Sequence, residues 1–136
     1  MSRTPWEYTL YIPHDPRAVG IGRRALRDIL MTHDLPALID PAELLASELL
    51  SNAVRHTKGP AALKLRRSGP SFRLGAWDTD PTPPATATTP THDESGRGLH
   101  LIDACSDDWG WFQVDRNGTR GKYVWCELDT DTRSGG

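Results

Sequence analysis

The sequence predicts an α+β fold of the two-layer sandwich class, with helices covering one face of a mixed, mainly antiparallel sheet. Three observations lead to this prediction. Apolar side chains recur at helical spacing in two long segments, segments rich in aromatic and β-branched residues or alternating in polarity flank them, and turn sequences join the later strands in pairs. The predicted order of elements is β-α-α-β-β-loop-α-β-β.

The first half of the chain supplies one strand and both long helices. Residues 6–12 (WEYTLYI) are predicted to form the strand. The first helix starts at Asp15-Pro16, because an acceptor side chain followed by proline is typical of a helix N-terminus. Asp40-Pro41 predicts the cap of the second helix, which runs to about His56.

The second half is predicted to contain two strand pairs and a short helix. The predicted elements are strands at 61–67 and 72–77, a helix at 99–105, and strands at 109–114 and 122–128. Asn117-Gly118 marks the turn between the last two strands, in a loop that we expect to be longer than two residues. The tail from Asp129 to Gly136 is expected to be frayed.

The segment at residues 79–95 differs from the rest of the chain. It is rich in proline and threonine and has almost no apolar side chain to bury. A long loop without secondary structure inside a compact domain is often a lid over a site. The alternative is a surface insertion without a function.

The composition predicts a single globular domain of 136 residues. The net charge of −2 gives no electrostatic reason to expect a direct nucleic-acid partner. Cys105 and Cys126 are expected to be reduced, small hydrophobic residues. Because the sequence shows no signal peptide and no membrane-spanning run, we expect a soluble, cytoplasmic protein.

Glu48 and Asn52 lie four residues apart on the second predicted helix, so they share one face of it. Their neighbours are mostly apolar, and this helix is therefore expected to be largely buried. A metal-bound phosphate would satisfy both side chains, since Mg²⁺ prefers oxygen ligands and a carboxylate can accept a proton. The alternative is a salt bridge from Glu48 to Arg55 or another arginine, with Asn52 facing solvent.

Two further features favour a nucleotide site. Asp78 follows a predicted strand, where its carboxylate can accept a hydrogen bond from an exocyclic amine. Gly96 and Gly98 precede a predicted helix and would let backbone N–H groups approach an anion. Asp78 can equally be a turn former, and the glycines a hinge. Gly121-Lys122 is either an additional phosphate donor or an ordinary turn.

In this order the features resemble a known family, the histidine-kinase-like ATPase domains of the GHKL (Bergerat) fold. Within it, they resemble the stand-alone anti-sigma-factor serine/threonine kinases of bacteria. The similar segments are the N box at Glu48–His56 (ELLSNAVRH), the DxGxG box at Asp78–Thr82, the glycine box at Gly96–Ile102 (GRGLHLI) and the terminal strand at Gly121–Trp125. The similarity covers about residues 5–128 of one domain at 1–136.

The resemblance implies a site for ATP and Mg²⁺ and a role for each matching residue. Glu48 would be the catalytic base, Asn52 would ligate Mg²⁺, and Asp78 would hold the adenine. Gly96 and Gly98 would cradle the phosphates. The other implied nucleotide contacts are Arg55, His56, Arg97 and Leu99.

The implied partner is an anti-anti-sigma protein of the STAS type or a sigma factor, and the chain is expected to dimerise with itself. Asp80 and Thr82 replace the two glycines of the DxGxG box. This departure motivates a second hypothesis, a degenerate member that binds a protein partner with weak or no ATP turnover. A third hypothesis takes Asp78-Thr79-Asp80 as the metal-binding DxD motif of a sugar-nucleotide transferase.

Overall fold

A computed structural model describes residues 4–56, 60–81, 101–116 and 118–131. Two long helices and a five-stranded sheet make up this part of the chain. The elements are β1 (Trp6–Ile12), α1 (Arg17–Thr32), a 3-10 helix (Pro36–Leu38), α2 (Ile39–His56), β2 (Ala61–Ser68), β3 (Ser71–Asp78), β4 (Asp108–Arg116) and β5 (Thr119–Asp129). Residues 101–105 add a short helical segment before β4.

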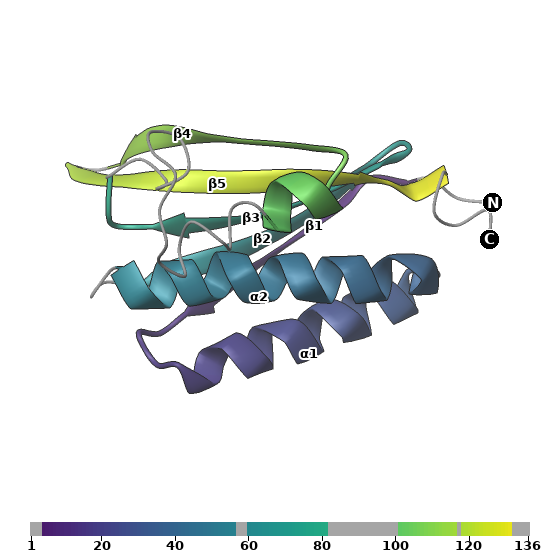
Figure 1. The fold of residues 1–136 in the computed structure, drawn as a ribbon, viewed down its shortest axis with the longest axis horizontal. Coiled ribbons are helices and arrows are strands. Elements are labelled where there is room, and N and C mark those ends of the chain that lie inside the picture. The colour runs from purple at the N-terminus through teal and green to yellow at the C-terminus, as the bar shows by residue number, and fades with distance from the viewer. Residues whose placement is uncertain (1–3, 57–59, 82–100, 117, 132–136) are drawn as a thin grey trace.

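The sheet has the strand order β1-β2-β3-β5-β4, and every described pair of neighbours is antiparallel. Helices α1 and α2 lie side by side beneath one face of the sheet (Figure 1). This arrangement confirms the predicted two-layer α+β sandwich. The expected mixed sheet is purely antiparallel in the described chain.

Local sequence explains where the helices begin, with one correction. The Asp15 carboxylate accepts a hydrogen bond from the backbone N–H of Arg17 at 2.9 Å and so stabilises the start of α1, as predicted. The prediction that Asp40 caps α2 is wrong. The 3-10 turn runs directly into α2 through Ile39, which has helical dihedral angles, so Asp40 lies inside the first turn.

The core forms because each central strand turns its apolar side chains toward the helices. Phe72 and Leu74 on β3 are fully buried there, and Leu26 of α1 and Leu50 of α2 meet them from the other layer. The alternation has a period of two residues, so the intervening side chains lie on the opposite face.

The two hairpins are tighter than the sequence predicts, and the tail is better anchored. Arg116 on β4 pairs directly with Thr119 on β5, so the expectation of a loop longer than two residues is wrong. Gly118 has a φ of 78°, which glycine adopts without strain.

Thr130 is 1% exposed and its backbone N–H donates to the Pro70 carbonyl at 2.7 Å, so the C-terminal segment is ordered up to this residue.

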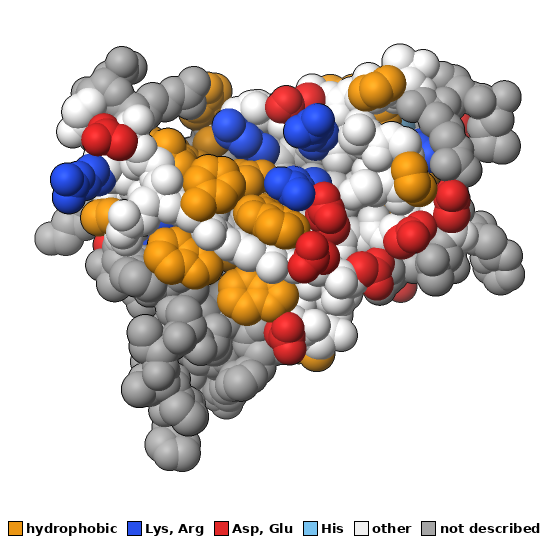
Figure 2. Space-filling view, turned by 90° about the horizontal axis from the view of Figure 1, so that it is seen from above, with side chains coloured by type: hydrophobic (Ala, Val, Ile, Leu, Met, Phe, Trp, Pro, Cys, Tyr) orange, Lys and Arg blue, Asp and Glu red, His pale blue; other side chains and the backbone are white. Residues whose placement is uncertain are grey.

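None of the described helices covers the second face of the sheet, which carries aromatic and charged side chains (Figure 2). Tyr123 lies against Gly75, and Trp125 lies against Gly110, where a β-carbon would collide with either ring. Burial raises the pKa of Tyr123 to about 12. The rings therefore lie across the strands and shield this face in part.

Both cysteines are free. Cys126 is fully buried, and burial raises the pKa of its thiol, which agrees with the role of a small hydrophobic residue. Cys105 is only half-buried. None of the described helices has the length and apolar character needed to cross a membrane.

Gly121 on β5 packs directly against the backbone of Asp78 on β3. A β-carbon at this position would collide with the carbonyl oxygen of Asp78, and backbone cannot move aside as a flexible side chain can. We therefore expect Gly121→Ala to lower the free energy of unfolding by about 1–3 kcal/mol. Urea denaturation followed by tryptophan fluorescence measures the change.

Gly20→Ala in α1 is the matched control. A β-carbon there would meet only an Arg24 guanidinium nitrogen at an ordinary 3.5 Å, so helix propensity decides the outcome. This variant should be more stable by about 0.5–1 kcal/mol. A Gly121→Ala protein as stable as the parent would contradict the close contact between β3 and β5.

Candidate functional site

Glu48 and Asn52 lie on one flank of α2. The opposite flank faces α1, where Arg27 Nε donates to the Glu43 carboxylate at 2.7 Å and Arg23 donates to the Ser47 hydroxyl at 3.4 Å. The core-facing side of α2 is formed by small and branched apolar residues. These are Ala42, Leu45, Ala46, Leu49, Leu50, Ala53 and Val54. Glu48 and Asn52 therefore share the flank that α1 leaves uncovered.

Both side chains are half-buried, less than the sequence led us to expect. Neither makes a hydrogen bond or an ion pair with any residue in the described part of the chain. The salt bridge from Glu48 to Arg55, which was the alternative reading, is thus not formed. A half-buried carboxylate and amide without protein partners are free to contact a ligand.

Asp78 is the most buried of the described acidic residues, with 3% of its surface exposed. It lies at the end of β3, and its Oδ1 atom accepts the backbone N–H of Asp80 at 2.9 Å. The Lys122 ammonium donates to the same oxygen at 3.2 Å and to the Asp80 carbonyl at 3.0 Å. Within the described chain, no hydrogen bond reaches Oδ2, which remains an acceptor for a ligand.

Two opposing effects act on the Asp78 carboxyl. Desolvation by burial raises its pKa, and the nearby Lys122 charge and the Asp80 N–H bond partly offset this rise. The two side chains are only 5% and 10% exposed, so solvent screens their attraction weakly. Lys122 therefore helps Asp78 to remain ionised in an apolar setting.

Lys122 was predicted as a possible phosphate donor, but in the structure its ammonium group donates to Asp78 and to the Asp80 carbonyl. β5 places Lys122 opposite Asp78 in the strand register, and both side chains point toward the helix layer. The sequence reasoning missed this pair, because nothing local connects residues 44 positions apart. One signal in the sequence was available. Because adjacent side chains in a strand point to opposite faces of the sheet, Lys122 and Tyr123 cannot both point away from the helices.

The remaining predicted contacts are only partly described. Arg55 is exposed on α2, and His56 ends that helix, with its side chain outside the described residues. Gly96, Arg97, Gly98 and Leu99 lie outside the described residues, as do Thr82 and the predicted lid beyond Pro81. These roles remain predictions.

Comparison with known proteins identifies the class. Residues 12–127 match the histidine kinase-like ATPase domain. An uncharacterized protein of Streptomyces coelicolor is 37% identical over 87 residues, which cover 60% of this chain and 78% of that protein. The chain belongs to the histidine kinase-like ATPase domain family. Domains of this family bind ATP, usually with Mg²⁺.

The ion pair predicts how stability depends on pH. Lys122→Met leaves the Asp78 carboxylate buried without its counter-charge, which we expect to cost about 3–5 kcal/mol at pH 7. Its pKa then rises further above the unfolded value. The loss of stability relative to the parent is therefore smallest at low pH, where the Asp78 carboxyl is protonated in both folded proteins. It grows as the pH rises from the folded-state pKa of the parent to the higher folded-state pKa of the variant.

Urea unfolding of the parent and variant between pH 4 and pH 8 measures this dependence. Lys64→Met is the matched control, because Lys64 is half-buried on the other sheet face. It should change stability little and equally at each pH. A Lys122→Met deficit that does not vary with pH would contradict the electrostatic role.

Proposed function

We propose that this protein is an ATP-binding regulatory protein that uses the flank of α2 and the end of β3 as its nucleotide site. The observation that carries the proposal is the set of unsatisfied polar groups on the helix side of the sheet. Glu48, Asn52 and Oδ2 of Asp78 have no hydrogen-bond partner among the described residues, and the sequence resemblance assigns all three residues to the N box and the DxGxG box.

The chemistry of these groups fits Mg-ATP. Asn52 offers an amide oxygen to Mg²⁺, and no group of three or more His, Cys, Asp or Glu side chains in the described chain could form a metal cage. A single protein ligand suits Mg²⁺ when phosphates supply further oxygens. Bound Mg²⁺ would neutralise phosphate charge, and Glu48 would accept the proton of an attacking hydroxyl.

Asp78 would hold the adenine through Oδ2, which can accept the exocyclic N–H. Oδ1 is already occupied by Lys122 and Asp80, so the carboxylate is fixed in orientation before the ligand arrives. A preorganised acceptor loses less entropy on binding than a freely rotating one. Gly96 and Gly98 would cradle the phosphates, with Arg55, His56, Arg97 and Leu99 around them.

The finer proposal is an anti-sigma-factor serine/threonine kinase that acts on a STAS-type anti-anti-sigma protein or a sigma factor. Support comes from the N box ELLSNAVRH at Glu48–His56 and from the glycine box that starts at Gly96. A homodimer and a cytoplasmic location belong to the same proposal.

A second candidate is a degenerate member that binds protein partners with little ATP turnover. The motivating observation is the segment after Asp78. Asp80 replaces a glycine of the DxGxG box, and its backbone N–H and carbonyl are engaged by Asp78 and Lys122. This segment is thus fixed by the ion pair at the position where the family pattern has a flexible glycine.

Isothermal titration calorimetry tests the nucleotide site. We expect Mg-ATP to bind the parent protein, and Asn52→Ala to weaken this binding about tenfold or more by removing an oxygen ligand. Without Mg²⁺ the two proteins should bind ATP with similar affinity. Ser51→Ala, a neighbouring half-buried position on α2, is the control and should bind as the parent does.

Equal heats from the parent and Asn52→Ala in the presence of Mg²⁺ would refute the metal assignment. Turnover separates the two candidates. Transfer of radiolabelled γ-phosphate to a STAS-type protein of the same organism, abolished in Glu48→Gln, identifies a kinase. ATP binding without transfer or hydrolysis supports the degenerate member.

A further inference from the structure

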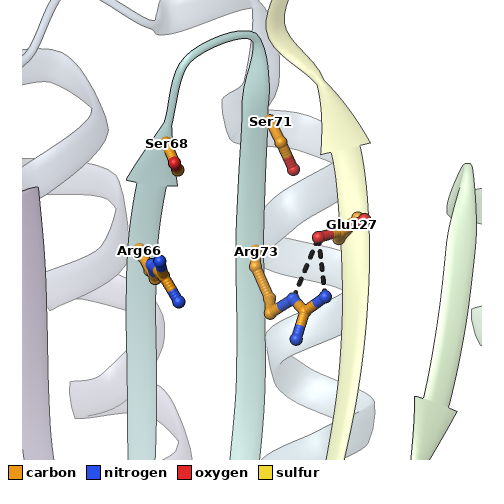
Figure 3. Close-up of a pocket in the computed structure, with 5 residues that line it drawn as sticks. All are labelled: Arg66, Ser68, Ser71, Arg73 and Glu127. Carbon is orange, nitrogen blue, oxygen red and sulfur yellow. Dashed lines mark hydrogen bonds and ion pairs between the residues drawn. The ribbon is translucent and has the colours of Figure 1, made fainter. Parts of the chain in front are cut away.

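A polar pocket lies on the sheet face that α1 and α2 leave open, on the opposite side of the sheet from the proposed nucleotide site. It has a volume of about 260 Å³ and is lined by Arg66, Ser68, Ser71, Arg73 and Glu127. These side chains come from β2, β3 and β5 near the turn that joins β2 to β3 (Figure 3). The pocket is smaller than the roughly 300–1,000 Å³ typical of sites for whole drug-sized ligands, so it fits a small group.

Two arginines line this pocket from neighbouring strands, and the guanidinium of Arg73 turns toward Glu127 (Figure 3). Arg66 on β2 and Arg73 on β3 are directly paired in the strand register and point to the same face. Like charges at such positions destabilise a sheet. A local conflict of this kind is expected where a ligand compensates for it.

The two guanidinium groups differ in their partners. Arg73 donates from Nε to a Glu127 carboxylate oxygen at 2.9 Å and stacks over the Trp125 ring, 4.0 Å from its centroid. Arg66 has no hydrogen bond or ion pair in the described chain. Glu7 lies opposite Arg66 on β1, yet no ion pair joins them. Arg66 therefore offers a full set of donors, while Arg73 is held rigidly beside it.

Two hydroxyl groups complete the lining. Ser68 and Ser71 are paired across the strands beside the arginines, and neither hydroxyl has a hydrogen-bond partner among the described residues. The pocket thus presents two guanidinium groups and two hydroxyl donors, against one carboxylate that is already engaged by Arg73. This excess of donors suits an acceptor with several oxygens and a negative charge.

We propose that Arg66, Arg73, Ser68 and Ser71 form a binding site for a phosphate-type oxyanion on the open face of the sheet. A tetrahedral phosphate group carries enough oxygens to accept from both arginines and both hydroxyls, whereas a carboxylate has two. The anion lies beside Arg66 and Arg73 and supplies the counter-charge that Arg66 lacks among the described residues. Free phosphate and a phosphoryl group on a serine side chain share this chemistry.

The negative charge of Glu127 repels a bound anion, and this gives the site a second testable property. Its carboxylate competes with the oxyanion for the Arg73 guanidinium. Glu127→Gln removes the competing charge and should strengthen phosphate binding about threefold or more. Arg66→Met removes the unpaired guanidinium and should weaken it about tenfold or more.

Amide-resolved NMR titration of the whole chain tests the proposal. Inorganic phosphate and O-phosphoserine are added in separate series at constant ionic strength, balanced with chloride. We expect saturable shifts at residues 66–73 and at the Trp125 indole N–H. Tighter binding of O-phosphoserine identifies the esterified phosphoryl group as the ligand, and tighter binding of inorganic phosphate identifies the free ion.

Arg24→Met is the matched control, because Arg24 is an exposed arginine on α1 in the other layer. It should bind phosphate as the parent does. Unchanged affinity in Arg66→Met, or shifts confined to α2 and residues 101–105, would overturn the proposal. The result is independent of the nucleotide site, since Asn52→Ala should leave these shifts unchanged.

Discussion

The fold depends on the burial of one face of an antiparallel sheet beneath α1 and α2, while the helices of the described chain leave the other face uncovered. Each strand alternates its side chains, so this constraint assigns every residue of the sheet to one of two environments. Phe72 and Leu74 enter the core, whereas Arg73 between them points to the open face. The two candidate sites follow from this division, because one lies on each side of the sheet.

The ion pair between Asp78 and Lys122 lies on the buried side of the sheet and contributes Asp78 to the proposed nucleotide site. Both residues lie on the apolar side, where a charge alone would be strongly disfavoured. Their contact joins the end of β3 to the first half of β5, and the close approach of Gly121 reinforces it. A buried pair of this kind contributes little net stability but fixes one orientation of the carboxylate. The proposed nucleotide site thus begins from a rigid acceptor.

The open face differs in its chemistry. Tyr123 and Trp125 lie flat over glycines, which limits the apolar surface exposed to water, and Arg73 stacks on Trp125. Basic side chains gather beside hydrophobic side chains on this face (Figure 2). The Trp125 ring and Glu127 hold Arg73 in place, while the neighbouring Arg66 has no hydrogen bond or ion pair in the described chain. A protein with both sites would bind phosphate groups on both faces of one sheet.

The sequence by itself determined the fold class, most element positions and the candidate residues on α2, because helical and strand periodicity and turn residues are local signals. It placed Glu48 and Asn52 on one helix face for the same reason. Only the tertiary structure decided that Asp40 is not a cap, that Lys122 pairs with Asp78, and that Arg66 and Arg73 share a pocket. These outcomes depend on strand register and on contacts between distant segments, which local patterns do not encode.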